Sequence, residues 1–344
     1  MLRRLSCLLP LLVLLIACEI PFSLEESAPP KLFVQCVPAD GATWVRVRYA
    51  APVGGQAPAA FRPSAVRLRV NGTVRELSET ADGFLRCAAP LQAGDAVSLE
   101  VAAEGLPTAF GTTTVPPCPR ICEAVVRQVD SDDGPVPCIS IRLDAPPAEH
   151  AFFGLQILRR QVAAYLENGI LCTEYRDSYT VPGRLLKEAD ILTADMGDYV
   201  QVDYADGGLE GWGEHPMTLL EASHFEEGIY RFYLDSFDVS LLAGLSGDGR
   251  QPVPEDFHFP DMEAGDMSGG RTYLGVTEMY RVRLYRLSPE FYYYAKALYG
   301  SQFDFLSNMG LIPPNFTYSN VKDGLGVVGA LAGTETDFLW VEDL

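Results

Sequence analysis

The sequence predicts a mainly β protein, in which an immunoglobulin-like β-sandwich is followed by a larger β-rich, sandwich-like domain with a short C-terminal helix. Glycine and proline number 31 and 25 among 344 residues, about one residue in six, which is typical of short elements joined by turns. Apolar and polar residues alternate in short runs, as they do in half-buried strands. In the first part of the chain these runs recur about every 8–12 residues, the spacing of a β-sandwich.

Residues 31–117 are expected to form the immunoglobulin-like domain. Residues 44–49 and 97–101 alternate with a period of two. Between them, Asn71-Gly72 separates two alternating runs and supplies the two positive φ angles of a type I′ hairpin turn. The domain ends at Pro116-Pro117, because proline cannot continue the hydrogen-bond ladder of a sheet.

Residues 118–344 also contain short alternating runs separated by turns, and they are expected to form the larger domain. Residues 152–166 fit two patterns, because their apolar side chains match both helical spacing and strand alternation. The segment 244–270 is rich in glycine, proline and acidic residues, which predicts a long loop. Strands are predicted at residues 122–129, 136–143, 199–204, 228–234 and 280–285.

A short helix is predicted near the C-terminus. Ser288 suits the N-cap, Pro289 suits the first helical position, and Glu290 places an acid in the first turn. Residues 291–298 are the expected body of the helix, and Gly300 is the expected C-cap.

The first 18 residues predict export and lipidation. Arg3 and Arg4 precede an apolar run of 12 residues, which is too short to span a membrane but typical of a signal peptide. Residues 15–18, Leu-Ile-Ala-Cys, resemble a bacterial lipobox. We therefore expect residues 1–17 to be a lipoprotein signal peptide and residues 18–30 to be a tether, with Cys18 carrying diacylglycerol and a further fatty acid such as palmitate. The alternative is an ordinary secretory signal followed by a chance cysteine.

The charge balance excludes one class of function. The formal net charge is −20, and loss of Arg3 and Arg4 with the signal peptide makes it about −22. Nucleic-acid binding needs a basic patch and none is visible in the sequence, so no nucleic-acid partner is expected. The acidic body is also not expected to adhere to anionic membrane surfaces, so the lipid would be its attachment to the membrane.

Six cysteines follow the lipidation motif, and an even number in an exported chain favours disulfides. Cys36 and Cys87 both lie in the first globular segment, so we expect a bridge between them. Cys118 and Cys122 have a zinc-like spacing, but no second pair of ligands follows them. The disulfide candidates are Cys36, Cys87, Cys118, Cys122, Cys138 and Cys172.

Two stretches near the C-terminus resemble a known family. Residues 287–294 (LSPEFYYY) and 318–330 (YSNVKDGLGVVGA) are similar to the C-terminal signature of the Bacteroidetes envelope lipoprotein family catalogued as domain of unknown function 4249. The resemblance implies an immunoglobulin-like domain before a larger β-rich domain and favours a strand at residues 152–157. It also implies an envelope lipoprotein whose relatives are often encoded beside TonB-dependent outer-membrane receptors. The family has no established activity, so the resemblance implies no catalytic residue.

Three glycines of this signature, Gly324, Gly326 and Gly329, match the pattern GxGxxG. A nucleotide-binding loop of this pattern needs a preceding strand and a following helix, and the nearby Pro313-Pro314 and the short remaining chain do not fit that arrangement. We therefore expect a tight turn into a strand at which two backbones approach closely.

Aromatic side chains are the first candidate ligand site. Trp212 lies in a glycine-rich stretch, and Tyr292 and Tyr293 belong to three consecutive tyrosines of the predicted helix. Consecutive residues point about 100° apart on a helix, so the three tyrosines cannot all lie in the core. Packing of most of these aromatic residues in the core is the alternative. The sequence does not identify the ligand.

An acidic segment is the second candidate site. Asp256, Asp261 and Asp266 lie with two glutamates within 12 residues, and such oxygen ligands suit calcium. The alternative is a solvated acidic loop, so calcium is the one cofactor that stays open. The four histidines share no metal-ligand spacing, and the chain has no GxSxG motif.

Taken together, these features favour binding over catalysis. We expect a non-enzymatic lipoprotein of the outer membrane, on a face that the sequence leaves open, acting as a binding or accessory component of a TonB-dependent nutrient receptor. The second hypothesis is an envelope hydrolase for glycans or peptides that uses carboxylate pairs from residues 195–266. The third is a purely structural envelope lipoprotein without a small ligand.

Overall fold

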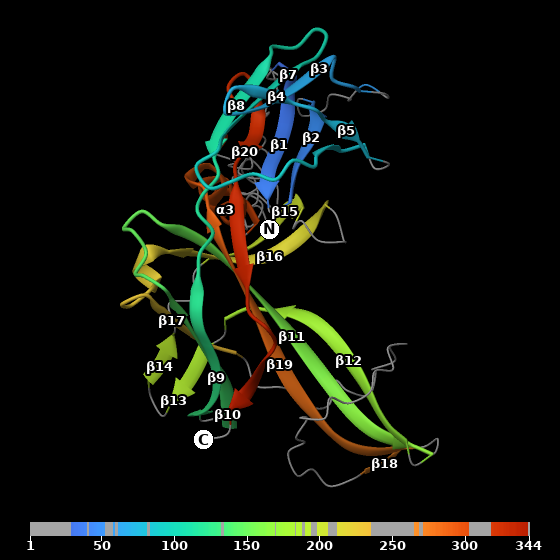
Figure 1. Cartoon of the computed structure of the whole chain (residues 1–344), viewed down its shortest axis with the longest axis vertical. Coiled ribbons are helices and arrows are strands. Elements are labelled where there is room, and N and C mark those ends of the chain that lie inside the picture. The colour runs from blue at the N-terminus through green and yellow to red at the C-terminus, as the bar shows by residue number, and fades with distance from the viewer. Residues whose placement is uncertain are drawn as a thin grey trace, which may run out of the picture.

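The computed structural model describes residues 29–39, 41–51, 58, 61–80, 83–131, 134–168, 170–182, 184–187, 190–193, 198–205, 212–234, 265–267, 271–302 and 318–342. The predicted fold class is confirmed, because these residues form a mainly β protein with several sheets, and α3 (Pro289–Gln302) is their one α-helix. Figure 1 shows an N-terminal β-sandwich at one end of the longest axis and a larger, open sheet that reaches the other end.

The N-terminal sandwich consists of two sheets with the strand orders β20-β1-β2-β6-β5 and β4-β3-β7-β8. Its core includes Leu32, Leu68 and Leu99, which are fully or almost fully buried. Apolar side chains alternate along β7, which is why one of its faces lies in this core. The strands are β1 (Lys31–Ala39), β2 (Ala42–Ala50), β3 (Ala65–Val70), β4 (Thr73–Arg75), β5 (Ser78–Glu79), β6 (Leu85–Cys87), β7 (Ala96–Ala102), β8 (Ala109–Thr114) and β20 (Leu325–Val328).

The hairpin predicted at Asn71-Gly72 forms between β3 and β4. The two residues have φ angles of 50° and 79°, as a type I′ turn requires. The Asn71 side chain also holds the start of β7, because its Oδ1 accepts a hydrogen bond from Ala96 N at 2.9 Å and its Nδ2 donates one to Asp95 Oδ1 at 2.8 Å.

The larger sheet has the main strand order β15-β16-β11-β19-β22-β9-β10-β17, and β12, β18 and β21 pair with β11 or β19 at its side. β13 (Arg184–Lys187) and β14 (Asp190–Thr193) form a separate pair, and the short helix η1 (Ala222–His224) follows β16. The strands of the larger sheet are β9 (Ile121–Ser131), β10 (Gly134–Leu143), β11 (Phe152–Glu167), β12 (Ile170–Thr180), β15 (Asp198–Ala205), β16 (Trp212–Glu221), β17 (Ile229–Tyr233), β18 (Gly265–Met267), β19 (Arg271–Leu287), β21 (Leu331–Glu335) and β22 (Leu339–Glu342).

Each strand predicted in the second part of the chain is present, and residues 152–166 are a strand. β11 lies between β16 and β19, and most of its residues are buried in two runs of five. Burial on both faces places apolar residues on both of them, so the alternation does not exclude a helix. Of the predicted loop 244–270, only residues 265–267 are described, and they form β18.

The helix α3 lies at the junction between the sandwich and the larger sheet. Ser288 is its N-cap as predicted, because Phe291 N donates a hydrogen bond to Ser288 Oγ at 3.3 Å. The helix continues through the predicted C-cap Gly300 to Gln302, a difference of the size usual for helix ends. The larger sheet has a second hydrophobic core, which includes Ile139, Phe153 and Phe232. A third core joins the two parts of the molecule and contains Val37 and Ala39 of β1, Met217 and Leu219 of β16, and Phe291, Tyr292 and Ala295 of α3.

The C-terminal signature returns to the N-terminal sandwich. β20 pairs in parallel with β1, with Gly326 opposite Val34. Gly326 has a φ of +103°, and a Cβ at this position would lie 2.0 Å from Val34 O. The expected close approach of two backbones is therefore confirmed, and a strand follows the glycines where a nucleotide-binding loop would have a helix. The sandwich thus includes residues 325–328 in addition to strands from the predicted range 31–117.

Candidate functional site

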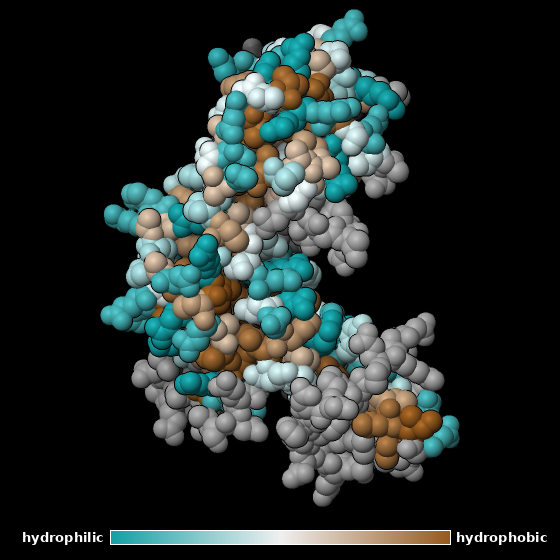
Figure 2. Space-filling view, in the orientation of Figure 1, coloured by the Kyte–Doolittle hydropathy of each residue, from teal (hydrophilic) through white to brown (hydrophobic). Residues whose placement is uncertain are grey.

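A long arm extends from the larger sheet. It is formed by residues 157–180 of β11 and β12 together with residues 271–282 of β19, which pair along their lengths. The three strands have 16, 11 and 17 residues, whereas strands of about 5–6 residues are usual. Figure 1 shows that the arm projects away from the sandwich. Ile170 and Leu171 near its turn are 68% and 42% exposed, and Figure 2 shows a hydrophobic patch at this end of the molecule.

The two faces of the sheet at the base of the arm have different compositions. Tyr280, Val282 and Leu284 of β19 are buried in the second hydrophobic core. The intervening residues Arg281 and Arg283 lie on the opposite face, because successive side chains of a strand alternate. The register places Arg160 of β11 on this same polar face.

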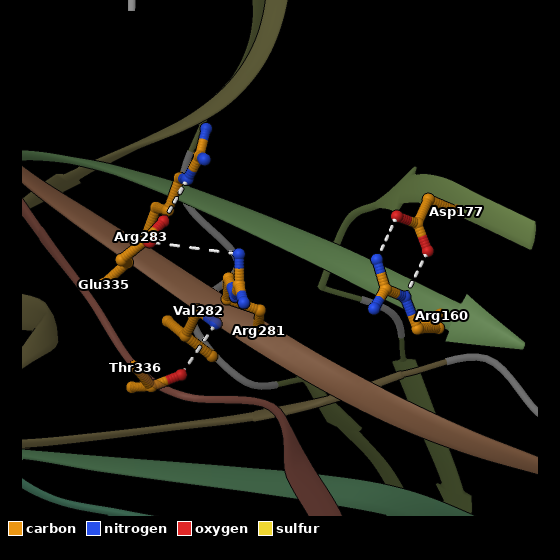
Figure 3. Close-up of polar contacts among 7 residues, drawn as sticks. All are labelled: Arg160, Asp177, Arg281, Val282, Arg283, Glu335 and Thr336. Carbon is orange, nitrogen blue, oxygen red and sulfur yellow. Dashed lines mark hydrogen bonds and ion pairs between the residues drawn. The ribbon is translucent and has the colours of Figure 1, made fainter. Parts of the chain in front are cut away.

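Arg160 is held by a carboxylate, which Figure 3 shows, and by two aromatic rings. Its Nε and Nη2 donate hydrogen bonds to the two carboxylate oxygens of Asp177, each at 2.7 Å. Its Cζ lies 4.4 Å from the ring centroid of Tyr175 and 4.2 Å from that of Phe338. The hydrogen bonds to Asp177 raise the pKa of Arg160. The guanidinium is therefore fixed in position as well as charged.

Glu335 at the end of β21 binds two further arginines. Arg283 Nε donates a hydrogen bond to Glu335 Oε2 at 2.7 Å, and Arg281 Nη1 lies 3.9 Å from Glu335 Oε1 (Figure 3). The Cζ of Arg281 is 4.3 Å from the ring centroid of Phe338. Phe338 thus contacts the guanidinium groups of both Arg281 and Arg160.

The segment 335–338, which carries Glu335 and Phe338, is fixed on β19 by backbone contacts. Thr336 N donates a hydrogen bond to Val282 O at 3.0 Å, and Val282 N donates one to Thr336 Oγ1 at 3.1 Å. These two bonds continue the pairing of β19 beyond β21. The positions of the arginines therefore depend on the C-terminal segment.

We call Arg160, Arg281, Arg283, Tyr175 and Phe338 the arginine–aromatic surface. It sets three arginines against two carboxylates, although the whole chain has a net charge of −20. Arginine and tyrosine are the residue types that concentrate binding energy in protein interfaces. The sequence signal for part of this surface was the alternation at residues 280–285, which predicted the strand but not the face that carries the arginines.

The predicted ligand residue Tyr292 is a buried residue of the junction. Its hydroxyl donates a hydrogen bond to Glu221 Oε1 at 2.6 Å, and Lys296 Nζ donates to the same oxygen at 3.2 Å. Burial and the bond to Glu221 raise the pKa of Tyr292 to about 12. The bonds from Tyr292 and Lys296 lower the pKa of Glu221. Tyr292 therefore stays protonated at neutral pH and does not suit the role of a general base.

Tyr293 is 45% exposed and belongs to an aromatic cluster beside Tyr292. Its ring centroid lies 5.5 Å from those of Phe152 and Tyr292 and 5.8 Å from that of Tyr318. The ring of Tyr292 stacks on Phe152 at 4.2 Å. Core packing explains Tyr292, while Tyr293 keeps an exposed edge.

The other predicted site residues are not brought together in the described residues. Trp212 is the first residue of β16, and Asp266 is the middle residue of β18. Cys18, Asp256 and Asp261 lie outside the described residues, as does most of the acidic segment. In the part of the chain that is described, no group of three or more histidine, cysteine or acidic side chains is arranged to bind a metal. No helix in this part is both long and apolar enough to cross a bilayer.

The described cysteines form no disulfide. Cys36 and Cys87 are both buried in the sandwich core, but β1 and β6 lie on opposite sides of β2. Two strands so placed are about 9–10 Å apart, whereas a disulfide requires a Cα separation below about 7 Å. The predicted Cys36–Cys87 bridge therefore does not form.

The remaining cysteines lie in the larger part of the molecule. Cys118 and Cys122 are exposed, and each thiol donates a hydrogen bond to a backbone carbonyl, Cys118 to Gly333 O at 2.9 Å and Cys122 to Arg142 O at 3.4 Å. Cys138 and Cys172 are half-buried. The expectation that these cysteines act as disulfide staples is likewise not met in the structure.

Comparison with known protein families identifies the family of the chain. The family model described as domain of unknown function (DUF4249) matches residues 18–337. No curated protein matches the chain. The matched range begins at Cys18 and includes the sandwich, the arm, α3 and β20. The chain therefore belongs to the family defined by domain of unknown function 4249.

Proposed function

We propose that this protein is an outer-membrane lipoprotein of a Bacteroidetes-type bacterium, anchored through Cys18, which binds a partner protein and is not an enzyme. The partner would be a TonB-dependent nutrient receptor, for which the protein acts as an accessory component. The lipobox-like residues 15–18 support the anchor, and the family match that begins at Cys18 agrees with a mature chain that starts there.

The observation that carries the binding role is the arginine–aromatic surface. Its guanidinium groups are fixed by carboxylates and aromatic rings, so little side-chain freedom would be lost when a partner binds. Its three arginines suit a partner surface that carries carboxylates, because complementary charges favour encounter and specificity.

The position of the arm also suits contact with a second protein. β1 begins at Lys31 next to the tether, and its last residues, Val37 to Ala39, reach the junction core. The larger sheet and its arm therefore lie beyond the junction, at the end of the molecule away from Lys31 (Figure 1). Thirteen residues from Cys18 to Lys31 would span at most about 45 Å, which leaves the body room to turn towards a neighbouring receptor.

The anchor is tested by cell fractionation. Cys18→Ala is expected to move the protein from the outer-membrane fraction to the soluble envelope fraction. Cys7→Ala, a change to the other cysteine of the leader, is the matched control and should leave the protein in the membrane. Membrane retention of the Cys18→Ala protein would show that the lipid is not the anchor.

The partner is tested by purification in mild detergent and identification of bound proteins by mass spectrometry. The wild-type protein is expected to retain a TonB-dependent receptor, and the double variant Arg160→Ala, Tyr175→Ala to lose most of it. Arg142→Ala removes an arginine that is paired with Glu123 on β9, away from the arm, and serves as the control. Equal recovery with all three proteins would refute the arm as the contact surface. Absence of any receptor across growth conditions would favour a structural role.

A further inference from the structure

A cleft lies where the segment between the two parts of the molecule meets the larger sheet. Its volume is about 360 Å³, within the range of about 300–1,000 Å³ typical of small-molecule sites. Its walls come from residues 117–120, from the last residue of β10 and the segment that follows it, and from Phe153 of β11 and Arg286 of β19. Arg286 is on the face of the sheet opposite to Arg281 and Arg283, so the cleft is separate from the arginine–aromatic surface.

Arg286 is the central residue of this cleft. It is paired with Phe153 in the register of β11 and β19, and its Cζ lies 4.9 Å from the ring centroid of Phe153. Phe153 is buried in the second core, which fixes the ring beneath the guanidinium. Arg286 itself is half-buried, and removal from water lowers its pKa.

Unlike the arginines of the arm, Arg286 has no carboxylate partner among the described residues. Arg160, Arg281 and Arg283 each lie within 4 Å of an aspartate or a glutamate oxygen. The chain has 46 acidic residues against 26 basic ones, so an unpaired, half-buried guanidinium is unexpected. Such a group is costly when it is alone and binds an anion well, because the anion restores the interactions lost from water.

The remaining walls indicate what kind of anion would fit. Pro117, Pro119, Leu143 and Pro147 give the cleft a largely apolar lining. Arg120 and Asp144 also line it, and with Arg286 they leave one net positive charge. The Cζ of Arg286 lies over the ring of Phe153, and the N–H groups of its side chain have no hydrogen-bond acceptor among the described residues. Guanidinium N–H groups bind both carboxylates and phosphates in a bidentate manner. The apolar lining therefore decides between them, because a carboxylate with an apolar body can contact it and inorganic phosphate cannot.

We propose that this cleft binds a small carboxylate with a compact apolar body. The carboxylate accepts hydrogen bonds from Arg286, and the apolar body contacts the proline and leucine side chains of the lining. This inference goes beyond the proposed function and does not depend on it, because neither the lipid nor the partner protein contributes to the cleft.

The binding experiment uses the purified mature chain carrying Cys18→Ala, with sodium benzoate as the probe. Saturation-transfer NMR and thermal melting are expected to show saturable binding of benzoate and weaker binding of inorganic phosphate. Arg286→Gln is expected to weaken benzoate binding about tenfold or more, as loss of charge-assisted hydrogen bonds does. Arg142→Gln, a change to an exposed arginine outside the cleft, should leave the affinity unchanged.

Folding of the variants is followed in the same melting experiment. Without benzoate, Arg286→Gln should melt at the same temperature as the parent chain or higher, because it removes an unpaired charge. Arg286→Lys keeps the positive charge but lacks the planar set of N–H donors of the guanidinium, and should also bind benzoate more weakly. The proposal is overturned by the absence of saturable benzoate binding up to 20 mM, by equal affinity of the Arg286→Gln protein, or by tighter binding of phosphate than of benzoate.

Discussion

Replacement of Gly326 by alanine is expected to separate β20 from the N-terminal sandwich. Gly326 has a φ of +103°, and an added Cβ would lie 2.0 Å from Val34 O and 2.9 Å from Val34 C. A left-handed conformation costs an L-residue roughly 1–2 kcal/mol. The overlap with backbone atoms, which cannot rotate away, adds about 1–3 kcal/mol. We therefore expect the free energy of unfolding to fall by about 2–5 kcal/mol.

Gly94 offers a matched control for this experiment. It also has a positive φ, +89°, but no atom lies within 4 Å of an added Cβ. Gly94→Ala should therefore show only the conformational cost, about 1–2 kcal/mol. The difference between the two variants isolates the close approach of β20 to β1.

Two measurements are needed, because β20 can separate without unfolding the whole chain. Urea unfolding gives the change in stability, and hydrogen exchange gives the protection of the amides of residues 325–328 and of their partners, residues 33–36 of β1. The reasoning is refuted if Gly326→Ala costs no more than Gly94→Ala and the exchange of residues 325–328 is unchanged.

Three further predictions concern charges and thiols. The pKa of Glu221 is lowered, so its stabilising contribution is complete above the ordinary pKa of 4.5 and is lost as the pH falls through the folded value. The Glu221→Gln protein should therefore lose less urea resistance than the wild-type protein between pH 7 and pH 3.5. Glu123→Gln, a change to an exposed glutamate, should not alter this loss. Asp177→Asn should lower the free energy of unfolding by less than about 1 kcal/mol, because the ion pair of Asp177 with Arg160 is partly exposed. This loss should be smaller in 1 M salt, and an equal loss in high salt would argue against an electrostatic origin. In the mature Cys18→Ala chain, a thiol reagent should titrate all six cysteines after denaturation, and fewer than six thiols would show that disulfides form. In the folded protein the reagent should react first with the exposed Cys118 and Cys122, because burial raises the pKa of Cys36 and encloses Cys87.

Features that depend on neighbouring residues could be predicted from the sequence. The turn at Asn71-Gly72, the N-cap Ser288 and the alternation along β7 each follow from a few consecutive residues, and each is present. Residues 152–166 are ambiguous because their burial depends on strands that are distant in the sequence. β11 is buried on both faces over much of its length, so apolar residues occur on both faces and its alternation does not exclude a helix.

Features that depend on distant segments could not be predicted in this way. The parallel pairing of β1 with β20 joins residues almost 300 positions apart, and no local pattern specifies it. The arginine–aromatic surface combines β11, β12, β19 and the segment 335–338, so its membership depends on strand order and register. The error about Cys36 and Cys87 has the same cause, because the sequence does not show that β2 lies between their strands.

The contacts of the C-terminal signature indicate that it serves to join the two parts of the molecule. Ser288 Oγ accepts hydrogen bonds from Phe291 N at 3.3 Å and from Ala330 N at 3.1 Å, which fixes α3 to the chain that leaves β20. A Cβ on Gly329 would lie 2.9 Å from the backbone of Phe291, so this contact requires glycine. Asn320 accepts a hydrogen bond from Val328 N and donates to Val328 O and to Thr112 O of β8.

These contacts of Ser288 and Asn320 all join parts of the molecule to one another. A relative that shares the signature should therefore share the junction of sandwich, α3 and larger sheet, whatever it binds. Differences in ligand or partner between relatives should instead arise at the arm and at the cleft around Arg286, whose walls lie outside the signature. Exchange of the arm between two relatives should accordingly transfer partner choice while the junction, and with it the stability of the chain, is preserved.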